Sequence, residues 1–281
     1  MSVQRSLTRG RTTLRDAGID SADIDARWIM AHVLGVVPDR LILFVHDALS
    51  AERERAFEAA IQDRCACKPV SHIIGGRWFH GHWFRVTGAV LDPRPETEGL
   101  VDLALGAPFS TVLDLGTGSG AIVLSLLAAR PDATGIGTDL SAPALEVAGL
   151  NARDLGLAAR AQFVQSDWFD RVTGRFDLIV SNPPYISEAE FAALAPDVAR
   201  WEPRRALTPG GDGLDPYRVI TARACDHLNP GGRLVVEIGH LQGPAVFEMF
   251  RAAGLDDVGV HPDMNGKDRV VSGAMPNGHS G

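Results

Sequence analysis

Short apolar runs alternate with helical patterns through the second half of the chain. Five runs predict buried strands, at residues 111–115, 134–140, 161–164, 176–180 and 233–238. Between the first three runs, residues 122–129 and 142–155 carry apolar positions at helical spacing. Strands that alternate with helices form parallel crossovers, so we expect an α/β sheet covered on both faces. Functional side chains should then lie at the carboxyl ends of the strands.

The first part of the chain has a different pattern. Apolar positions at helical spacing, such as Ile24, Trp28 and Ile29, predict helices up to about residue 70. Ser50 is placed as the N-cap of one of them, since acidic residues follow it in the first turn. Next, residues 77–86 carry aromatic side chains on both sides of Gly81, which predicts a hairpin. A helix start is predicted at 93–98, where Pro, Thr and Glu are found together.

Composition narrows the classes of protein. The 281 residues carry a formal net charge of −8, which disfavours general attraction to nucleic acid. No run of about 18 apolar residues occurs, so we expect no membrane span. The arginines of the first 15 residues, among serines and threonines, are typical of a transit peptide. A helical pattern follows without a linker, however, and this favours a basic first helix and a cytoplasmic enzyme.

The cysteines and histidines do not predict a metal site. Cys65 and Cys67 form a CxC pair without a second pair, and Cys225 is distant in sequence, so all three are interpreted as reduced thiols. His80 and His82 flank the glycine of the predicted hairpin, where a turn explains them. We expect no metal.

Two strand ends carry the residues of a nucleotide-type cofactor site. The first strand leads into a glycine-rich loop, formed by Gly116, Thr117, Gly118, Ser119 and Gly120. Glycines let the backbone approach a ligand, and the helix that follows offers free N–H groups. Asp139 ends the next strand, about 20 residues after the glycines, where a carboxylate can accept both hydroxyls of a ribose. This pattern fits both nicotinamide dinucleotides and S-adenosylmethionine.

Two further strand ends add a site for a base and a stiff corner, and the corner favours S-adenosylmethionine over a nicotinamide dinucleotide. Asp167 and Trp168 follow the third strand, and can read an adenine amino group and stack on its ring. The fourth strand runs into Ser181-Asn182-Pro183-Pro184-Tyr185. The prolines hold this corner stiff, so the Asn182 side-chain oxygen and the Pro183 carbonyl can both accept from one NH₂ group. Tyr185 offers a flat face to a planar amide or base.

This paired acceptor indicates methyl transfer to an amide or amine nitrogen. Such a nitrogen is a poor nucleophile, and accepting its protons stabilises the positive charge that develops during attack. Glutamine amides and adenine N6 both satisfy this requirement. A nicotinamide oxidoreductase would have no role for the corner, and a non-catalytic binding module would not need both the loop and the corner.

The chain resembles the HemK-type, or PrmC-like, glutamine methyltransferases that modify class-1 peptide chain release factors and support translation termination. The resemblance extends over most of the chain. It is carried by VSHIIG at 70–75, PRPETE at 93–98, VLDLGTGSGAI at 112–122, SDWF at 166–169, SNPPYI at 181–186 and KDRVV at 267–271.

The resemblance implies a fold, a domain order and site roles. The fold is α/β, with a Rossmann-like seven-stranded class I methyltransferase domain after a small all-α domain and a β-hairpin linker. The domains are 1–70, helical and substrate-docking; 71–92, the linker; 93–275, the methyltransferase; and 276–281, a flexible tail. The cofactor would be S-adenosylmethionine, bound by 116–120, Asp139, Asp167, Trp168 and Asn182.

The resemblance also implies how the substrate is held. Asn182, Pro183, Pro184 and Tyr185 would bind the glutamine of a Gly-Gly-Gln loop, and Asn182, Pro183 and Tyr185 would be catalytic. The partner would be a class-1 release factor and the enzyme a monomer, with no nucleic acid or membrane. Adenine N6 of DNA or RNA is the alternative substrate. Arg94 and Glu96 are interpreted as a structural ion pair that positions the hairpin.

Overall fold

The structure, a computed structural model, describes residues 1–194 and 196–277. The contacts divide it into two units. The first unit contains Met1–Gly76 and the short segment that ends at Trp201, and the second contains Arg77–Leu194 and the described residues from Glu202 onward. Of the predicted flexible tail at 276–281, residues 278–281 lie outside the described residues.

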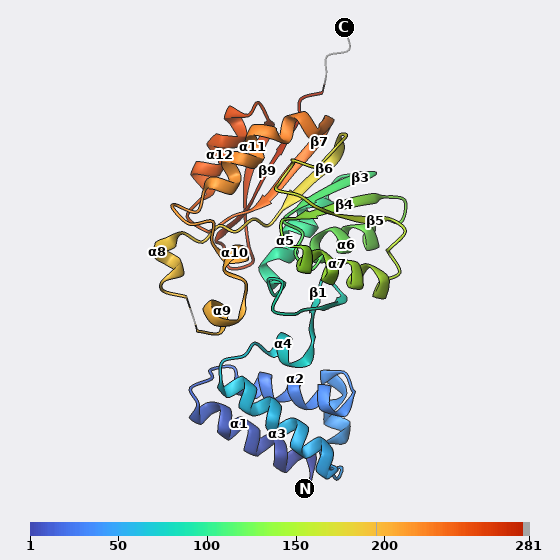
Figure 1. The fold of residues 1–281 in the computed structure, drawn as a ribbon, viewed down its shortest axis with the longest axis vertical. Helices are drawn as coiled ribbons and strands as arrows, with labels where there is room; N and C mark the ends of the chain where they lie inside the picture. The colour runs from blue at the N-terminus through green and yellow to red at the C-terminus, as the bar shows by residue number, and fades with distance from the viewer. Residues whose placement is uncertain (195, 278–281) are drawn as a thin grey trace. The chain divides into compact units, whose positions relative to one another are not determined.

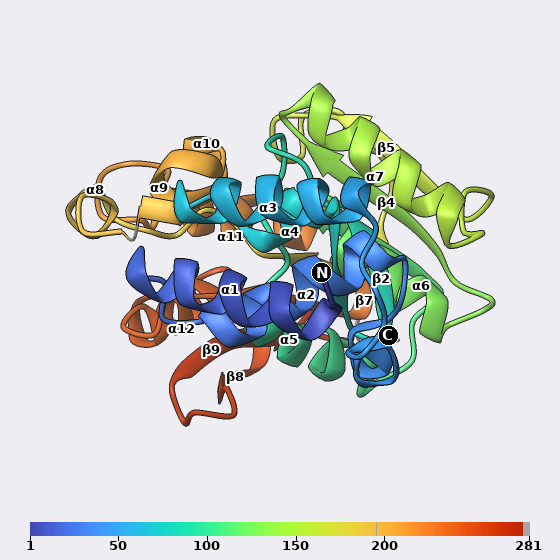
Figure 2. The ribbon, with the colours of Figure 1, turned by 90° about the horizontal axis from the view of Figure 1, so that it is seen from below.

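The first unit is helical, as the apolar spacing predicted. Its elements are α1 (Val3–Asp16), α2 (Ala22–Leu34), the 3₁₀ helix η1 (Pro38–Phe44), α3 (Ala51–Cys65), α4 (Val70–Ile74) and α9 (Pro196–Trp201). The helices α1, α2 and α3 pack against one another (Figure 2) and bury Leu14, Ile29 and Phe57. Ser50 caps α3, as predicted, because its hydroxyl accepts from the Arg53 N–H at 3.3 Å.

The predicted hairpin forms at the start of the second unit. Strands β1 (Gly76–Phe79) and β2 (His82–Arg85) pair through a two-residue turn. His80 and Gly81 both have positive φ, at 46° and 77°, which a tight turn between twisted strands requires. The side chains of Phe79 and Phe84 are fully buried and meet edge to face at 6.0 Å.

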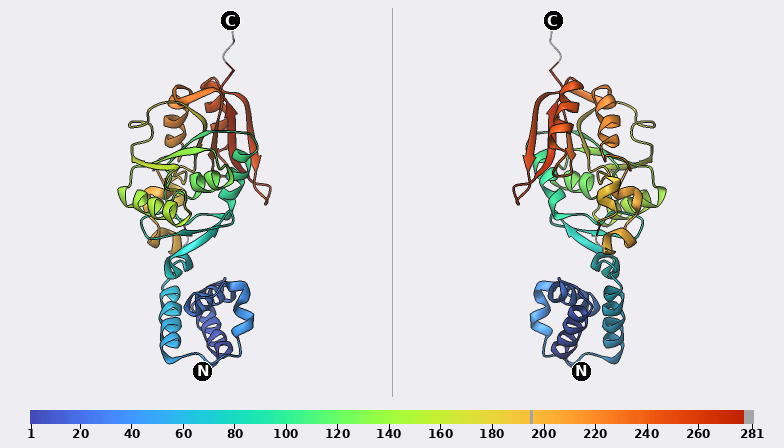
Figure 3. Two further views of the ribbon diagram at one scale, coloured as in Figure 1. Left: turned by 90° about the vertical axis from the view of Figure 1, so that its right-hand side faces the viewer. Right: turned by 90° about the vertical axis from the view of Figure 1, so that its left-hand side faces the viewer.

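The second unit is built on a sheet of seven strands in the order β5-β4-β3-β6-β7-β9-β8 (Figure 1). The strands are β3 (Thr111–Leu115), β4 (Thr134–Asp139), β5 (Ala161–Gln165), β6 (Phe176–Ser181), β7 (Leu228–Glu237), β8 (Asp256–Pro262) and β9 (Asp268–Ala274). The first five run parallel, and β9 pairs antiparallel with both β7 and β8. In Figure 3 the red strands β8 and β9 lie at one side of the sheet, with β8 as its edge strand.

Helices cover both faces of this sheet. Apolar side chains of α5 (Pro95–Leu105), α6 (Ala121–Ala129) and α7 (Ala142–Asp154) pack with Val112, Leu178 and Val235 on one face. Those of α11 (Asp215–His227) and α12 (Gly243–Ala252) pack with Leu113, Ile179 and Leu234 on the other. Alternate residues of each strand thus enter different layers, which is why the strands read as continuous apolar runs.

The predicted fold class is confirmed. The order places the crossover between β3 and β6 near the middle of the sheet, where two neighbouring strands lead to helices on opposite faces. Loops that follow these strand ends can separate and leave a crevice. Two short helices, α8 (Glu188–Phe191) and α10 (Arg204–Leu207), belong to the long connection after β6. In the described part of the chain, no helix has the length and apolar character needed to cross a membrane.

Candidate active site

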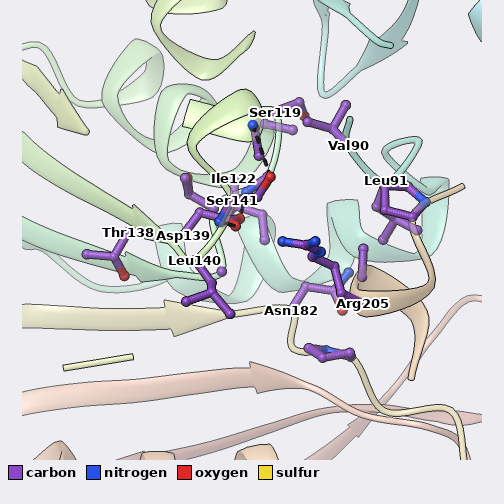
Figure 4. A pocket seen from close by; sticks show the side chains of 18 of the residues that line it. Val90, Leu91, Ser119, Ile122, Thr138, Asp139, Leu140, Ser141, Asn182 and Arg205 are labelled. Atoms are coloured by element: carbon purple, nitrogen blue, oxygen red, sulfur yellow. Dashed lines mark hydrogen bonds between the residues drawn. The ribbon is translucent and has the colours of Figure 1, made fainter. Parts of the chain in front are cut away.

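A cavity of about 240 Å³ lies at the carboxyl ends of β3, β4, β5 and β6 (Figure 4). It brings together most of the predicted site residues: Gly116, Thr117, Gly118, Ser119, Asp139, Asp167, Trp168, Asn182 and Pro184 all line it. Its apolar wall includes Val90, Leu91, Ile122 and Leu140. Three predicted residues, Gly120, Pro183 and Tyr185, do not line the cavity.

The glycine-rich loop turns tightly from β3 into α6. Gly118 has φ of 53°, and its N–H donates to the Asp139 carboxylate at 3.0 Å. No atom outside its chain neighbours lies within 4 Å of the position that a Cβ would take there, so the loop presents bare backbone. Gly120 serves packing instead. A Cβ at Gly120 would come within 3.0 Å of Leu124 and 3.2 Å of Ala148, where α6 packs near α7.

Asp139 is held at the end of β4 by backbone donors. Its carboxylate accepts from the N–H groups of Gly118 at 3.0 Å and Ser141 at 2.8 Å. Burial raises the pKa of Asp139, and these hydrogen bonds and the Arg205 guanidinium act in the opposite direction. The carboxylate therefore lines the cavity in a fixed orientation.

A second carboxyl group lies beneath the same loop. Asp114 is fully buried, and it accepts a hydrogen bond from the Thr117 hydroxyl at 2.7 Å. Burial raises the pKa of Asp114 to about 7, although the Thr117 bond opposes the shift. Its other oxygen, Oδ1, has no hydrogen-bond partner among the described residues. An unpartnered buried oxygen is costly, and sites that bind ligands are where such groups persist.

Asp167 and Trp168 reach the cavity from the loop after β5. Trp168 is half-buried and has φ of 45°, an unfavourable value for a residue with a Cβ. Trp168 lines the cavity from this conformation, and Asp167 lines it from an exposed position. Strained backbone of this kind gathers at functional sites.

The Asn-Pro-Pro-Tyr corner follows β6 directly. Ser181 fixes its start, because the Ser181 hydroxyl donates to the Leu115 carbonyl of neighbouring β3 at 2.7 Å. Asn182 is half-buried and its amide nitrogen donates to the Thr97 hydroxyl at 3.2 Å. Pro183 is buried, and the Tyr185 hydroxyl donates to Glu237 Oε1 at 3.3 Å.

Three residues with a place in the site are absent from the sequence predictions. Thr97 and Arg205 line the cavity, and Glu237 is buried at the end of β7 behind Asn182 and Tyr185. Figure 4 shows the Arg205 guanidinium directed into the cavity near Asn182. Glu237 could have been found, since it ends a predicted strand as Asp139 does. Arg205 gave no such signal, because it lies on a four-residue helix within a long connection.

The predicted pairing of Arg94 with Glu96 is wrong. Arg94 donates to the buried carboxylate of Glu202 at 2.6 Å, and Glu96 is exposed in the first turn of α5. Glu96 lies where the positive end of a helix favours an acid, which explains it without an ion pair. The Arg94–Glu202 pair instead ties the start of α5 to the segment that carries Arg205.

Neither a metal cluster nor a disulfide accompanies this site. No three His, Cys, Asp or Glu side chains of residues 1–194 and 196–277 are placed to hold a metal ion together. Cys65, Cys67 and Cys225 are free thiols.

The strand order, the glycine-rich loop and the acid that ends β4 define the class I methyltransferase fold. A methyltransferase from Pyrococcus furiosus shares this fold, with a TM-score of 0.53 and 18% identity over 69% of this chain and 88% of that one. Residues 6–75 match the PrmC N-terminal domain, and residues 97–214 match the methyltransferase small domain.

Curated relatives define the family. A release factor glutamine methyltransferase from Cereibacter sphaeroides is 56% identical over 94% of this chain and 95% of its own length. Another, from Rhodospirillum rubrum, is 45% identical over 95% of this chain and 83% of its own. The chain belongs to the release factor glutamine methyltransferase family.

The cavity fits the cofactor of this class, S-adenosylmethionine. The loop offers bare backbone at Gly118, and Asp139 offers the carboxylate that hydroxyl groups require. The apolar wall and Trp168 suit a planar base. Asp114 is buried beneath the loop and does not line the cavity.

Proposed function

We propose that this protein transfers a methyl group from S-adenosylmethionine to the side-chain amide nitrogen of the glutamine in the Gly-Gly-Gln motif of class-1 release factors. One observation carries the proposal: Asn182 lies on the wall of the same cavity as Gly118 and Asp139. An acceptor for an amide nitrogen and the features of a cofactor site therefore meet in one space.

On the cofactor side, the protein binds and orients. When bound, S-adenosylmethionine supplies an electrophilic methyl carbon. We assign the ribose to Asp139, whose carboxylate is held by two backbone donors. The adenine is assigned to Asp167 and Trp168, and the methionine part to the loop at 116–120. The apolar wall excludes water, which would otherwise weaken each of these polar contacts.

On the substrate side, the corner holds the amide. With its nitrogen bonded to Thr97, Asn182 has its side-chain oxygen available as an acceptor. We assign the second acceptor to the carbonyl of Pro183, which is buried next to the cavity-lining residues Asn182 and Pro184 and does not itself line the cavity. Pro184 is assigned to the wall against which the glutamine packs. Two acceptors that hold the protons of one NH₂ group favour a pyramidal nitrogen, whose lone pair is less delocalised, and they stabilise the positive charge that develops on nitrogen. The stiff corner also supplies the positioning part of catalysis.

We assign docking of the release factor to the helical unit. This unit contains residues 6–75, which match the PrmC N-terminal domain. The reaction chemistry is the task of the second unit, which contains the whole cavity lining.

A labelling experiment tests the function. The protein is incubated with S-adenosylmethionine carrying a labelled methyl group and a class-1 release factor, and mass spectrometry locates the label. We expect it on the glutamine of the Gly-Gly-Gln motif, and none on a factor in which this glutamine is replaced by alanine. Duplex DNA in a parallel reaction tests the adenine alternative, and label on adenine alone would overturn the proposal.

A further inference from the structure

A buried polar chain leads from the cavity wall into the core, and the proposed roles leave it unexplained. It begins at Asn182, whose amide nitrogen donates to the Thr97 hydroxyl at 3.2 Å. Thr97 is 4% exposed, and its hydroxyl faces the carboxyl group of Glu237, which is 1% exposed. The Tyr185 hydroxyl donates to the same carboxyl group at 3.3 Å.

The hydrogen bonds of this buried polar chain run in one direction, from the Asn182 amide through Thr97 to Glu237. The Thr97 hydroxyl carries one proton, and its oxygen already accepts from Asn182. The proton is thus available to the Glu237 carboxyl group, with which the Thr97 side chain interacts. A reversed Asn182 amide would need the Thr97 proton for its own oxygen and would remove the Thr97 donor from the buried Glu237 carboxyl group. It would also present N–H groups to a substrate NH₂, which has only protons to offer.

The carboxyl group is held firmly in place. The Tyr217 hydroxyl donates to the Glu237 main-chain carbonyl at 2.9 Å. The Gln242 amide donates to the Tyr185 carbonyl at 2.9 Å and accepts from the Gly239 N–H at 3.0 Å. The end of β7 and the Asn-Pro-Pro-Tyr corner are therefore tied to one frame.

Charged and titratable groups face Glu237 from several elements. They are Tyr185 after β6, Tyr217 on α11, Arg269 on β9 and Glu96 on α5. Burial raises the pKa of Glu237 to about 7, against the opposing effects of Thr97, Arg269 and Tyr185. Its protonation therefore changes near neutral pH.

We propose that Thr97 and Glu237 are positioning residues that orient the Asn182 amide, so that its oxygen faces the substrate nitrogen. The inference rests on the proposed function. Neither side chain needs to touch the glutamine. Their effect reaches the reaction only through the direction in which Asn182 points.

The test removes one hydroxyl group and keeps the shape. Thr97→Val deletes the acceptor for Asn182, and we expect kcat to fall about 10- to 100-fold. Cofactor affinity, measured by calorimetry, should change less than about threefold, because Asp139 and the glycine-rich loop are untouched. Thr97→Ser restores the hydroxyl and should recover most of the kcat.

Thr111→Val is the matched control. The Thr111 hydroxyl also donates to a carboxylate, that of Asp177 at 3.1 Å, but at the amino end of β3. This variant should keep the wild-type kcat. The inference would be overturned if Thr97→Val kept the kcat of the wild-type protein, or if Thr97→Ser were as slow as Thr97→Val. The proposed function would still be upheld in that case, provided that the wild-type protein methylates the release factor. Absence of transfer by the wild-type protein would overturn both.

Glu237→Gln provides a second readout. An amide in this place offers one acceptor to two hydroxyl donors, so the chain is broken at its end. We expect a lower kcat and, more tellingly, loss of the step near pH 7 that the wild-type kcat should show. An unchanged pH profile would contradict the role of Glu237 even if the variant were less stable.

Discussion

The two ends of the central sheet hold carboxylates in opposite states. At the amino end, Asp177 of β6 accepts four hydrogen bonds, from the Ser110 and Thr111 N–H groups, the Thr111 hydroxyl and the Asn229 amide, at 2.7–3.1 Å. Burial alone would raise the pKa of Asp177, but these donors outweigh it and lower the pKa. At this end of the sheet, the protein itself supplies the hydrogen bonds that the Asp177 carboxylate needs.

At the carboxyl end of the sheet, two buried acids have incomplete hydrogen bonding. Asp114 and Glu237 are each buried with one unpartnered oxygen, and the pKa of each is raised to about 7. The pKa of Asp139 is likewise raised, and burial is the main cause. One end of the sheet therefore has a carboxylate that the protein itself satisfies, whereas the other end, beside the cavity, has carboxyl groups with incomplete hydrogen bonding. Changes at one end should affect stability, and changes at the other should affect binding and rate.

The largest expected effect is on the rate of methyl transfer, and it distinguishes Asn182 from Asn229. Asn182→Ala removes an acceptor for the reacting nitrogen and should cost roughly 2–4 kcal/mol of transition-state stabilisation, with little change in cofactor affinity. Asn229→Ala removes a donor to Asp177 and should keep kcat but lower stability by about 1 kcal/mol. Single-turnover methyl transfer and thermal unfolding measure the two quantities. Normal turnover by Asn182→Ala would contradict the clamp.

Next in size is the effect on cofactor binding. Asp139→Ala should raise the dissociation constant of S-adenosylmethionine about 10- to 100-fold, the value of one or two charge-assisted hydrogen bonds. Asp177→Ala, at the other end of the sheet, should leave this constant unchanged. Isothermal calorimetry compares them directly. Equal constants for Asp139→Ala and the wild-type protein would refute the ribose assignment.

The sequence predicted the site residues that directly follow the strands better than those in the connecting segments. Asp139 and Asn182 were found because each follows an apolar strand, and strand ends meet at one edge of a parallel sheet. Glu237 follows the same rule but lies behind the corner, so only its contacts with Thr97 and Tyr185 reveal a role. Arg205 reaches the cavity through a connection whose path is set by the Arg94–Glu202 pair, a contact between residues far apart in sequence.

The last two strands show the same limit of prediction from sequence. β8 and β9 were not predicted from hydrophobic patterning, because residues 256–262 are mostly half-buried or exposed and mix acids with apolar residues. β8 lies at the edge of the sheet, which relaxes the need for a continuous apolar run, whereas β9 lies between β7 and β8 and has only a short apolar run at residues 270–271. The Thr111 and Asn229 donors to Asp177 were equally invisible, since local pattern says nothing of which side chains meet across strands.

A third prediction concerns stability against pH at the carboxyl end. The pKa of Asp114 in the folded protein, about 7, lies above its unfolded value, so the folded state binds this proton more tightly. Stability should therefore fall as pH rises from about 4 to 7. Asp114→Asn should stabilise the protein at pH 8 by on the order of 1–2 kcal/mol and change little at pH 4. Denaturant unfolding at both pH values measures this, and a loss of stability at pH 8 would contradict it.

The smallest effect is expected at the amino end, and its sign is the reverse. Because the pKa of Asp177 is lowered on folding, its stabilisation is present above the unfolded pKa of about 3.9 and is lost as pH falls through the folded pKa. Asp177→Asn should cost about 1 kcal/mol at pH 7, since Asp177 is partly exposed and solvent screens its charge. The cost should vanish toward pH 2–3, with kcat unchanged throughout. If Asp177→Asn and Asp114→Asn shifted stability in the same direction at pH 8, the contrast between the two ends of the sheet would be wrong. That contrast rests on Asp177 being hydrogen-bonded by the protein itself and on Asp114 being buried with one oxygen that has no partner among the described residues.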